Sequence, residues 1–320
     1  MKKFGLTIAI LAVLVVAYVI ADALLFDGIK PISVDEKGLQ AQFFVKKNST
    51  HNTAVILIGG GQWGDYWSHY FAKNDMAALS LPYAGGGKLP RLPEEIELEY
   101  FEEALRWLSA RPEVDPDKIV VMGASRNAEL ALVLGATFPG QIHGVVGYAP
   151  SAVSWSNTVL PYNSDEIKAS WTYQGKAIPF IAMDKPIGNA TSNIDLLAYW
   201  NKGLADSAAV AQAAIPVERI QGPILLFSGK DDQVWPSTKM ANMIGQRLET
   251  QGFAHDFQNH QYGNAGHMIS GNPDDPSHFA DRSMELEGET FSYKVGGTAE
   301  GDFKAKQQAR EKLMLFLKQL

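Results

Sequence analysis

Three stretches of the sequence carry side chains that together could perform acyl transfer. Ser125 stands in VVMGASRNAEL (120–130), where an apolar run ends in a glycine turn and a helical sequence follows at once. An attacking serine needs exposure at a tight turn, a histidine that takes its proton, and a carboxylate that orients the histidine. Downstream, the apolar run PILLFS leads into Asp231 and Asp232, and His267 follows the alternating stretch 255–262.

The order of these residues and their positions after predicted strands favour catalysis. Taken singly, Ser125 is typical of a helix cap, the aspartates of a solvated turn, and a histidine beside glycine of a structural residue. Together they occur in the order serine, acid, histidine. This is the chain order of triads in which the nucleophile lies on a sharp turn between a strand and a helix. We therefore predict that Ser125, Asp232 and His267 form a catalytic triad.

Two adjacent aspartates compete for the acid position. Asp232 lies three residues after Gly229 and four before Pro236, the usual frame of the acid turn, so we favour it. We expect Asp231 to accept backbone hydrogen bonds or to face solvent.

Attack on a carbonyl also requires two backbone N–H groups that stabilise negative charge on the oxygen. The residue after the nucleophile, here Arg126, supplies one of them. The glycine-rich loop 59–64 (GGGQWG) follows a predicted strand and lets the backbone approach a substrate, so we expect the N–H of Gly61 to be the second. This loop does not match the P-loop pattern for phosphate binding, because no GK[ST] follows it.

The composition excludes several classes of protein. The chain has 320 residues, a net charge of −7 and no cysteine. We expect no nucleic-acid partner, because no lysine and arginine cluster is present, and no disulfide or thiolate chemistry. The histidines other than His267 have no ligand-like spacing, so we expect neither metal nor cofactor. The expected partner is a small-molecule acyl thioester or ester substrate.

Residues 1–26 differ from the rest of the chain. Lys2 and Lys3 precede an almost unbroken apolar run over residues 4–20. Such a run reaches the lower limit for a membrane anchor. A cleaved signal peptide is the alternative, because Ala21-Asp22-Ala23 supplies a cleavage pattern. Either interpretation predicts membrane association or secretion, with the following domain outside the cytoplasm.

Residues 31–320 alternate short apolar runs with helical stretches, which predicts one α/β domain with a mostly parallel, doubly wound sheet. The predicted central strands are 54–58, 77–82, 118–122, 145–149 and 223–228, and residues 37–47 are typical of a strand in an edge hairpin. The predicted helices are 93–109, 125–138, 237–249 and 304–317.

The interval 151–217 is far longer than a crossover between strands requires. We predict an inserted cap over the carboxyl edge of the sheet, where open α/β folds bind ligands, with a hairpin at 171–175. Trp155 and Trp235 are candidates for a substrate pocket beneath this cap. Burial in the cap core is the alternative for both side chains.

Several motifs resemble the C-terminal catalytic domain of the acyl-CoA thioesterase and bile acid-CoA:amino acid N-acyltransferase family. They are GASRNAELAL at 123–132 within the stretch 89–139, GKDDQVW at 229–235, and the Gly-Gly-Thr at 296–298. The resemblance implies an α/β-hydrolase fold with Ser125 as nucleophile. Asn127 departs from the family pattern, which has glycine there, and we expect a slightly displaced helix and a retained nucleophile.

Three functions fit these motifs. The first is a serine hydrolase that cleaves thioester or carboxylic ester bonds through an acyl-serine intermediate. The second is an acyltransferase, in which an amine replaces water. The third is a non-catalytic, membrane-tethered ligand-binding protein that has kept the fold. We take the hydrolase as the expectation.

Overall fold

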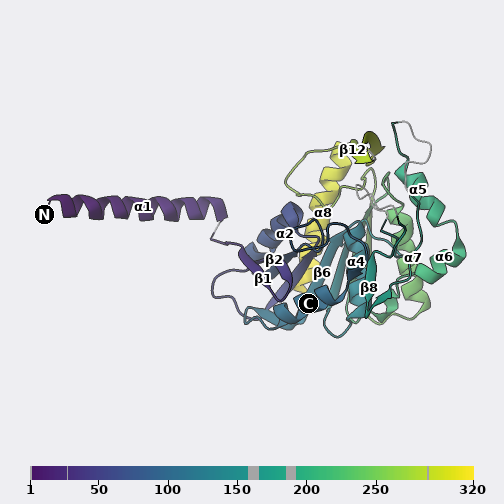
Figure 1. The fold of residues 1–320 in the computed structure, drawn as a ribbon, viewed down its shortest axis with the longest axis horizontal. Coiled ribbons are helices and arrows are strands. Elements are labelled where there is room, and N and C mark those ends of the chain that lie inside the picture. Colours follow the sequence, from purple (N-terminus) through teal and green to yellow (C-terminus); the bar gives the residue numbers. More distant parts are fainter. Residues whose placement is uncertain (1, 27, 158–165, 185–191, 287) are drawn as a thin grey trace.

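An eight-stranded sheet forms the centre of the molecule (Figure 1). The computed structural model describes residues 2–26, 28–157, 166–184, 192–286 and 288–320. In spatial order the strands are β1 (Ile32–Glu36), β2 (Leu39–Phe44), β4 (Ala77–Leu81), β3 (Asn52–Ile58), β6 (Val114–Ala124), β7 (Gly144–Tyr148), β10 (Ile224–Gly229) and β11 (Phe257–Tyr262). The strands from β4 to β11 run parallel, whereas β1 and β2 run antiparallel to their neighbours. The predicted doubly wound α/β sheet and its edge hairpin are confirmed.

The central strands are apolar at successive positions because both faces of the sheet are covered. In β3, Ala54 and Ile56 belong to one hydrophobic core, and Val55 and Leu57 belong to the other. All four side chains are buried. A strand with only one buried face would alternate with polar residues instead.

Helices cover the two faces of the sheet (Figure 1). On the side of Val55, the core is completed by α2 (Gly61–Lys73) and α8 (Ala299–Lys318). The other core is completed by α3 (Glu99–Ser109), α4 (Arg126–Thr137) and α7 (Ser237–Thr250). Thr298 caps α8 by accepting a hydrogen bond from the Gly301 N–H, so this helix begins before the predicted residue 304.

The predicted helix 93–109 is wrong in its first turn. Residues Ile96–Glu97 form the short strand β5, which pairs with β8 (Trp171–Tyr173). The chain then turns back from β8 into the antiparallel strand β9 (Lys176–Ala177), as the predicted hairpin at 171–175 requires. Pairing with a distant strand outweighs the local helix propensity of this glutamate-rich stretch.

The interval 151–217 contains β8, β9, α5 (Leu196–Gly203) and α6 (Ser207–Ala213), and a short 3-10 helix, η1 (Val217–Arg219), begins at its last residue. Residues 158–165 and 185–191 of the predicted cap lie outside the described part of the chain. A hairpin that the sequence analysis missed, β12 (Asp281–Leu286) and β13 (Glu289–Lys294), stands between β11 and α8. This hairpin contacts the 151–217 interval through a hydrogen bond from the Ile194 N–H to the Ser292 carbonyl, at 2.9 Å.

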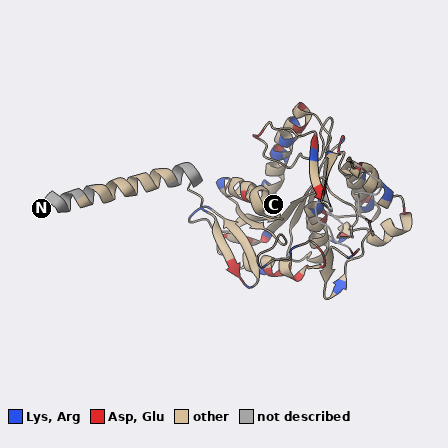
Figure 2. Cartoon of the chain, turned by 45° about the horizontal axis from the view of Figure 1, so that its top comes forward, with Lys and Arg blue, Asp and Glu red and all other residues tan. Residues whose placement is uncertain are grey.

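Residues Lys2–Phe26 form a single helix, α1, which extends away from the domain (Figure 1). The large apolar side chains between residues 10 and 20, such as Val13 and Leu14, are more than half exposed. Figure 2 shows that Lys and Arg are interspersed with Asp and Glu over the domain. Within the described ranges, no helix is both long and apolar enough to cross a membrane.

Candidate active site

Ser125, His267 and Asp232 lie beyond the carboxyl ends of β6, β11 and β10. Ser125 Oγ is 3.0 Å from Nε2 of His267. Nδ1 of the same ring is 2.9 Å and 3.1 Å from the two carboxylate oxygens of Asp232. With the proton on Nδ1, the ring donates to the carboxylate and leaves Nε2 free to accept from the hydroxyl. The structure therefore brings together the three residues that the sequence analysis selected.

Ser125 is held in a strained backbone conformation. Its φ of 57° and ψ of −123° lie in a region that costs a residue with a side chain about 1–3 kcal/mol. Its N–H donates to the Tyr148 carbonyl at 2.8 Å, which ties the turn to β7. This sharp turn between β6 and α4 is the geometry of an exposed nucleophile.

Asn127 fits beside this turn because a neighbouring glycine leaves room for its side chain. The Tyr83 hydroxyl donates to Asn127 Oδ1 at 2.7 Å. A Cβ added to Gly59 would lie 2.3 Å from Asn127 Nδ2. A Cβ added to Gly123 would lie 2.0 Å from the Asn127 carbonyl oxygen, so the first turn of α4 rests directly against β6. The first turn of α4 thus keeps its close approach to β6 with asparagine in place of the second glycine, and the contact gives no support to the slight displacement of the helix that was expected.

Replacing Asn127 with glycine is expected to lower the free energy of unfolding by about 1–2 kcal/mol, because a hydrogen bond and a helix-favouring side chain are lost. Gly59→Ala is expected to destabilise the wild type strongly, because its Cβ collides with the Asn127 amide. The same change should cost less in the Asn127→Gly background, and urea unfolding of all four proteins measures this coupling. Simple addition of the two costs would contradict the proposed contact.

Asp232 is nearly buried and accepts several hydrogen bonds besides the one from His267. The N–H groups of Val234 and Trp235 donate to Oδ1 at 2.9 Å and 3.1 Å. The Ser237 hydroxyl donates to Oδ2 at 2.6 Å. These donors satisfy the carboxylate oxygens and restrict the rotation of the side chain.

Asp231 has a different environment. It is exposed, its Oδ2 accepts from the Gly297 N–H at 2.9 Å, and its Oδ1 accepts from the Gln233 amide at 3.0 Å. The prediction that Asp231 accepts backbone hydrogen bonds is confirmed.

Glycines allow two segments to approach each other: the acid turn (229–236) and the loop after β11 that carries His267, called the histidine loop below. A Cβ added to Gly229 would lie 2.2 Å from the Gly266 carbonyl oxygen. A Cβ added to Gly266 would lie 2.3 Å from the Gly296 carbonyl oxygen. Side chains at these positions would separate Asp232 from His267.

Asp302, in the first turn of α8, is a supporting residue that the sequence analysis missed. Its carboxylate is buried, and Oδ1 accepts from the Gly266 N–H at 2.7 Å, immediately before His267. His278 Nδ1 lies 2.8 Å from Oδ2. In the sequence, Asp302 is marked only by its position shortly after Gly296-Gly297-Thr298. That pattern does not predict a contact between Asp302 and the histidine loop.

The two expected oxyanion donors both lie at helix N-termini. Arg126 is the first residue of α4, and Gly61 is the first residue of α2 rather than part of a loop as predicted. In the described ranges neither N–H donates to a backbone carbonyl, whereas those of Gly59 and Gly60 donate to Leu81 and Leu57. Unpaired N–H groups at helix N-termini can receive an anion. The oxyanion role of Arg126 and Gly61 stays a prediction.

A buried ion pair connects the elbow to residues of the 151–217 interval. The Arg126 guanidinium pairs with Glu129 one turn further along α4, and also donates to the Trp155 and Ser156 carbonyls, each at 3.2 Å. Glu129 Oε1 accepts from the Trp171 indole at 2.8 Å. Glu129 is therefore a hydrogen-bonding residue of the interior.

Burial raises the pKa of Glu129 to about 7 from 4.5, with Arg126 opposing the shift. The folded protein thus binds this proton more tightly than the unfolded chain. The resulting stability is complete below about pH 4.5 and is lost as the pH rises through about 7. A shift of this size corresponds to about 3 kcal/mol.

The free energy of unfolding of the wild type, relative to that of Glu129→Gln, is therefore expected to fall by about 3 kcal/mol between about pH 4.5 and pH 8. Urea unfolding of both proteins across this range gives the difference. A difference independent of pH would contradict the raised pKa.

A cavity of about 160 Å³ opens beside the catalytic pair. Its lining residues are Ser125, Arg126, Leu196, Trp200, Val234, Trp235, His267, Met268, Tyr293 and Val295. Trp235 thus lies where the sequence analysis placed it, and its ring meets that of His267 edge-on at 6.0 Å. Trp155 is fully buried behind Trp200 and does not line this cavity.

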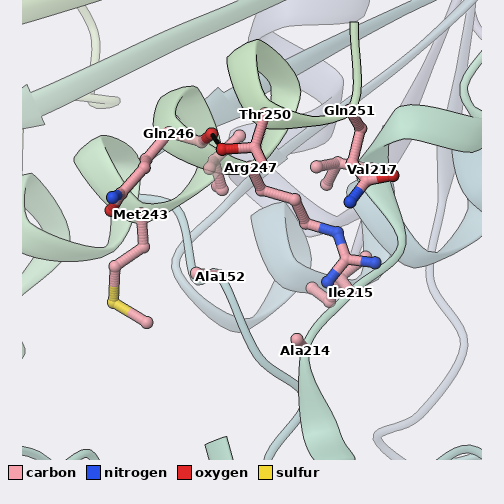
Figure 3. Close-up of a pocket in the computed structure, with 10 residues that line it drawn as sticks. Ala152, Ala214, Ile215, Val217, Met243, Gln246, Arg247, Thr250 and Gln251 are labelled. Carbon is pink, nitrogen blue, oxygen red and sulfur yellow. Dashed lines mark hydrogen bonds between the residues drawn. The ribbon is translucent and has the colours of Figure 1, made fainter. Parts of the chain in front are cut away.

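A separate hollow of about 320 Å³ lies between α7 and the segment before η1 (Figure 3). Figure 3 shows the Arg247 side chain extending from α7 toward Ile215 and Val217. Its guanidinium donates to both carboxylate oxygens of Glu218, at 2.6 Å and 2.7 Å. None of the predicted site residues lines this hollow.

Solved structures of low sequence identity share this fold. A dienelactone hydrolase-like promiscuous phosphotriesterase from metagenomic libraries superimposes with a TM-score of 0.52 at 15% identity, covering 92% of this chain and 99% of that chain. The acylaminoacyl peptidase of Pyrococcus horikoshii gives 0.54 at 12% identity, over 92% and 43% of the two chains. The sheet, the elbow and these likenesses define an α/β-hydrolase fold.

Residues 96–320 match the family described as BAAT / Acyl-CoA thioester hydrolase C terminal, and the chain belongs to this family. Mouse acyl-coenzyme A thioesterase 6 is 28% identical over 227 residues, 70% of this chain and 51% of the relative. Rat acyl-coenzyme A thioesterase 1 is 29% identical over 251 residues, 76% and 54% of the two chains. This chain spans about half the length of these curated relatives. It is an acyl-CoA thioesterase-like α/β-hydrolase.

Proposed function

We propose that this protein hydrolyses acyl thioesters of the acyl-CoA type, or carboxylic esters, through a covalent acyl-Ser125 intermediate. The observation that carries the proposal is the His267 ring, which reaches Ser125 Oγ with one nitrogen and the Asp232 carboxylate with the other. Family membership supports the thioester as the bond that is cleaved.

In the proposed reaction, Ser125 Oγ attacks the acyl carbonyl carbon while His267 Nε2 takes the hydroxyl proton. The Arg126 and Gly61 N–H groups stabilise the oxyanion. The C–S bond breaks, and the thiolate leaves with the proton from His267. Water then attacks the acyl ester, again with His267 as base, which releases the carboxylic acid and restores the serine. Asp232 keeps the ring oriented and stabilises its positive charge in both steps.

Turnover of acyl-CoA thioesters and p-nitrophenyl esters by the full chain tests the proposal. A fluorophosphonate probe should label the protein at Ser125, located by mass spectrometry of the labelled peptide. The same assays with added glycine or taurine distinguish hydrolysis from acyl transfer to an amine, because transfer yields an amide. Ligand binding without labelling or turnover would instead support the non-catalytic alternative. Membrane association and a location outside the cytoplasm stay predictions of the sequence.

A further inference from the structure

The described residues that line the cavity beside Ser125 offer a substrate no unpaired permanent cation. Among the described residues that line it, Arg126 is the one permanent cation, and its guanidinium is already paired with Glu129. The other polar groups away from the catalytic pair are the Trp235 indole and the Tyr293 hydroxyl. Both are neutral, because an indole N–H does not ionise and burial raises the pKa of Tyr293.

The rest of the lining is apolar and comes from separate parts of the chain. Leu196 and Trp200 belong to α5, Val234 to the acid turn, Met268 to the histidine loop, and Val295 follows β13. The Trp200 ring contacts that of Trp235 with centroids 5.7 Å apart, and both side chains are buried. These contacts hold the walls in place, so the size of the cavity limits what it can accept.

The volume of this cavity is small. At about 160 Å³ it is close to the roughly 150 Å³ of an engineered apolar cavity that admits benzene, a ligand of six carbon atoms. Each methylene that enters such a cavity gains about 0.8 kcal/mol, roughly fourfold in affinity, and a methylene left in solvent gains nothing.

We propose that the acyl group of the substrate is short, apolar and uncharged, with about six carbons, and that it occupies the cavity lined by Leu196, Trp200 and Trp235. This inference rests on the proposed function and specifies its substrate. A longer chain extends past the walls without further burial. A terminal carboxylate on the acyl group is rejected, because it would be desolvated against apolar side chains, and the described lining residues offer no unpaired cation for it.

Straight-chain acyl-CoA thioesters from acetyl to palmitoyl test the length. We expect kcat/KM to rise roughly fourfold for each added methylene up to hexanoyl, and to stay level or fall beyond about octanoyl. Hexanedioyl-CoA, which differs from hexanoyl-CoA by a terminal carboxylate, should react at least about 100-fold more slowly.

Two substitutions change the cavity in opposite directions. Leu196→Ala enlarges it and should move the optimum toward longer chains, whereas Val234→Phe fills it and should move the optimum toward shorter ones. Leu197→Ala is the matched control, because Leu197 is the next residue of the same helix and does not line the cavity. Its chain-length profile should equal that of the wild type, and circular dichroism verifies that each variant is folded.

The outcomes separate this inference from the proposed function. Ser125-dependent turnover with an optimum at dodecanoyl or longer, unchanged by Leu196→Ala, would overturn the acyl assignment alone. Equal rates for hexanoyl-CoA and hexanedioyl-CoA would overturn the prediction that the cavity rejects an acyl group with a terminal carboxylate. Absence of Ser125-dependent turnover with every thioester would overturn the proposed function, and the inference with it.

Discussion

Ser125→Ala is expected to lower kcat for thioester hydrolysis by at least about 10³-fold, and by up to about 10⁶-fold if the serine supplies most of the catalysis. The substitution removes the atom that attacks the carbonyl and leaves the cavity unchanged. Alanine keeps a Cβ at the same positive φ, so the free energy of unfolding should change by less than about 0.5 kcal/mol. Steady-state kinetics and urea unfolding measure the two effects.

Ser125→Gly separates catalysis from backbone strain. Glycine adopts a φ of 57° without the steric cost of a side chain, so this variant should be more stable than wild type by about 1 kcal/mol. It should be as inactive as Ser125→Ala. Turnover of Ser125→Ala within tenfold of the wild-type value would show that another group is the nucleophile.

Asp232→Asn is expected to lower kcat by about 10⁴-fold, the effect of this change in a serine–histidine–acid triad. The asparagine amide can donate to Nδ1 of His267, which favours the tautomer with its proton on Nε2. That tautomer cannot accept the proton of the Ser125 hydroxyl. Single-turnover kinetics with a thioester substrate measures the loss in the acylation step.

Asp231→Asn is the matched control for this prediction. The carboxylate of Asp231 is exposed and accepts from the Gly297 N–H, a bond that the asparagine oxygen can still accept. We expect kcat within about threefold of wild type, the usual range for a surface change away from the chemistry. A larger loss at Asp231 than at Asp232 would reverse the choice between the two acids.

The residues that carry the proposed chemistry were visible in the sequence because local patterns place them. Short apolar runs predicted the central strands, and Ser125 and Asp232 each follow one of them, whereas His267 follows the alternating stretch 255–262. In a parallel sheet the carboxyl ends of neighbouring strands meet at one edge, so convergence follows from the pattern. The choice of Asp232 over Asp231 also came from local spacing, through the turn that runs from Gly229 to Pro236.

Contacts between segments far apart in the chain were decided by the tertiary structure. Residues 96–97 became a strand because β8 lies beside them, although their own sequence favours a helix. The fit of the Asn127 side chain could not be predicted from neighbouring positions in the sequence. It depends on Gly59, which leaves space for the amide, and on Tyr83, whose hydroxyl donates to it. No local pattern signalled that Asp302 accepts the Gly266 N–H.

The sequence by itself thus determined the α/β class, the positions of the central strands and the choice of the three side chains proposed to carry the chemistry, because these depend on periodicity and on turns of a few residues. The tertiary structure alone decided the size and charge of the cavity. Its walls come from α5, the acid turn, the histidine loop and β13 with the residue after it, and the Arg126 guanidinium is paired with Glu129. The physical reason is that volume and charge pairing arise from distances between segments, which a one-dimensional pattern does not contain.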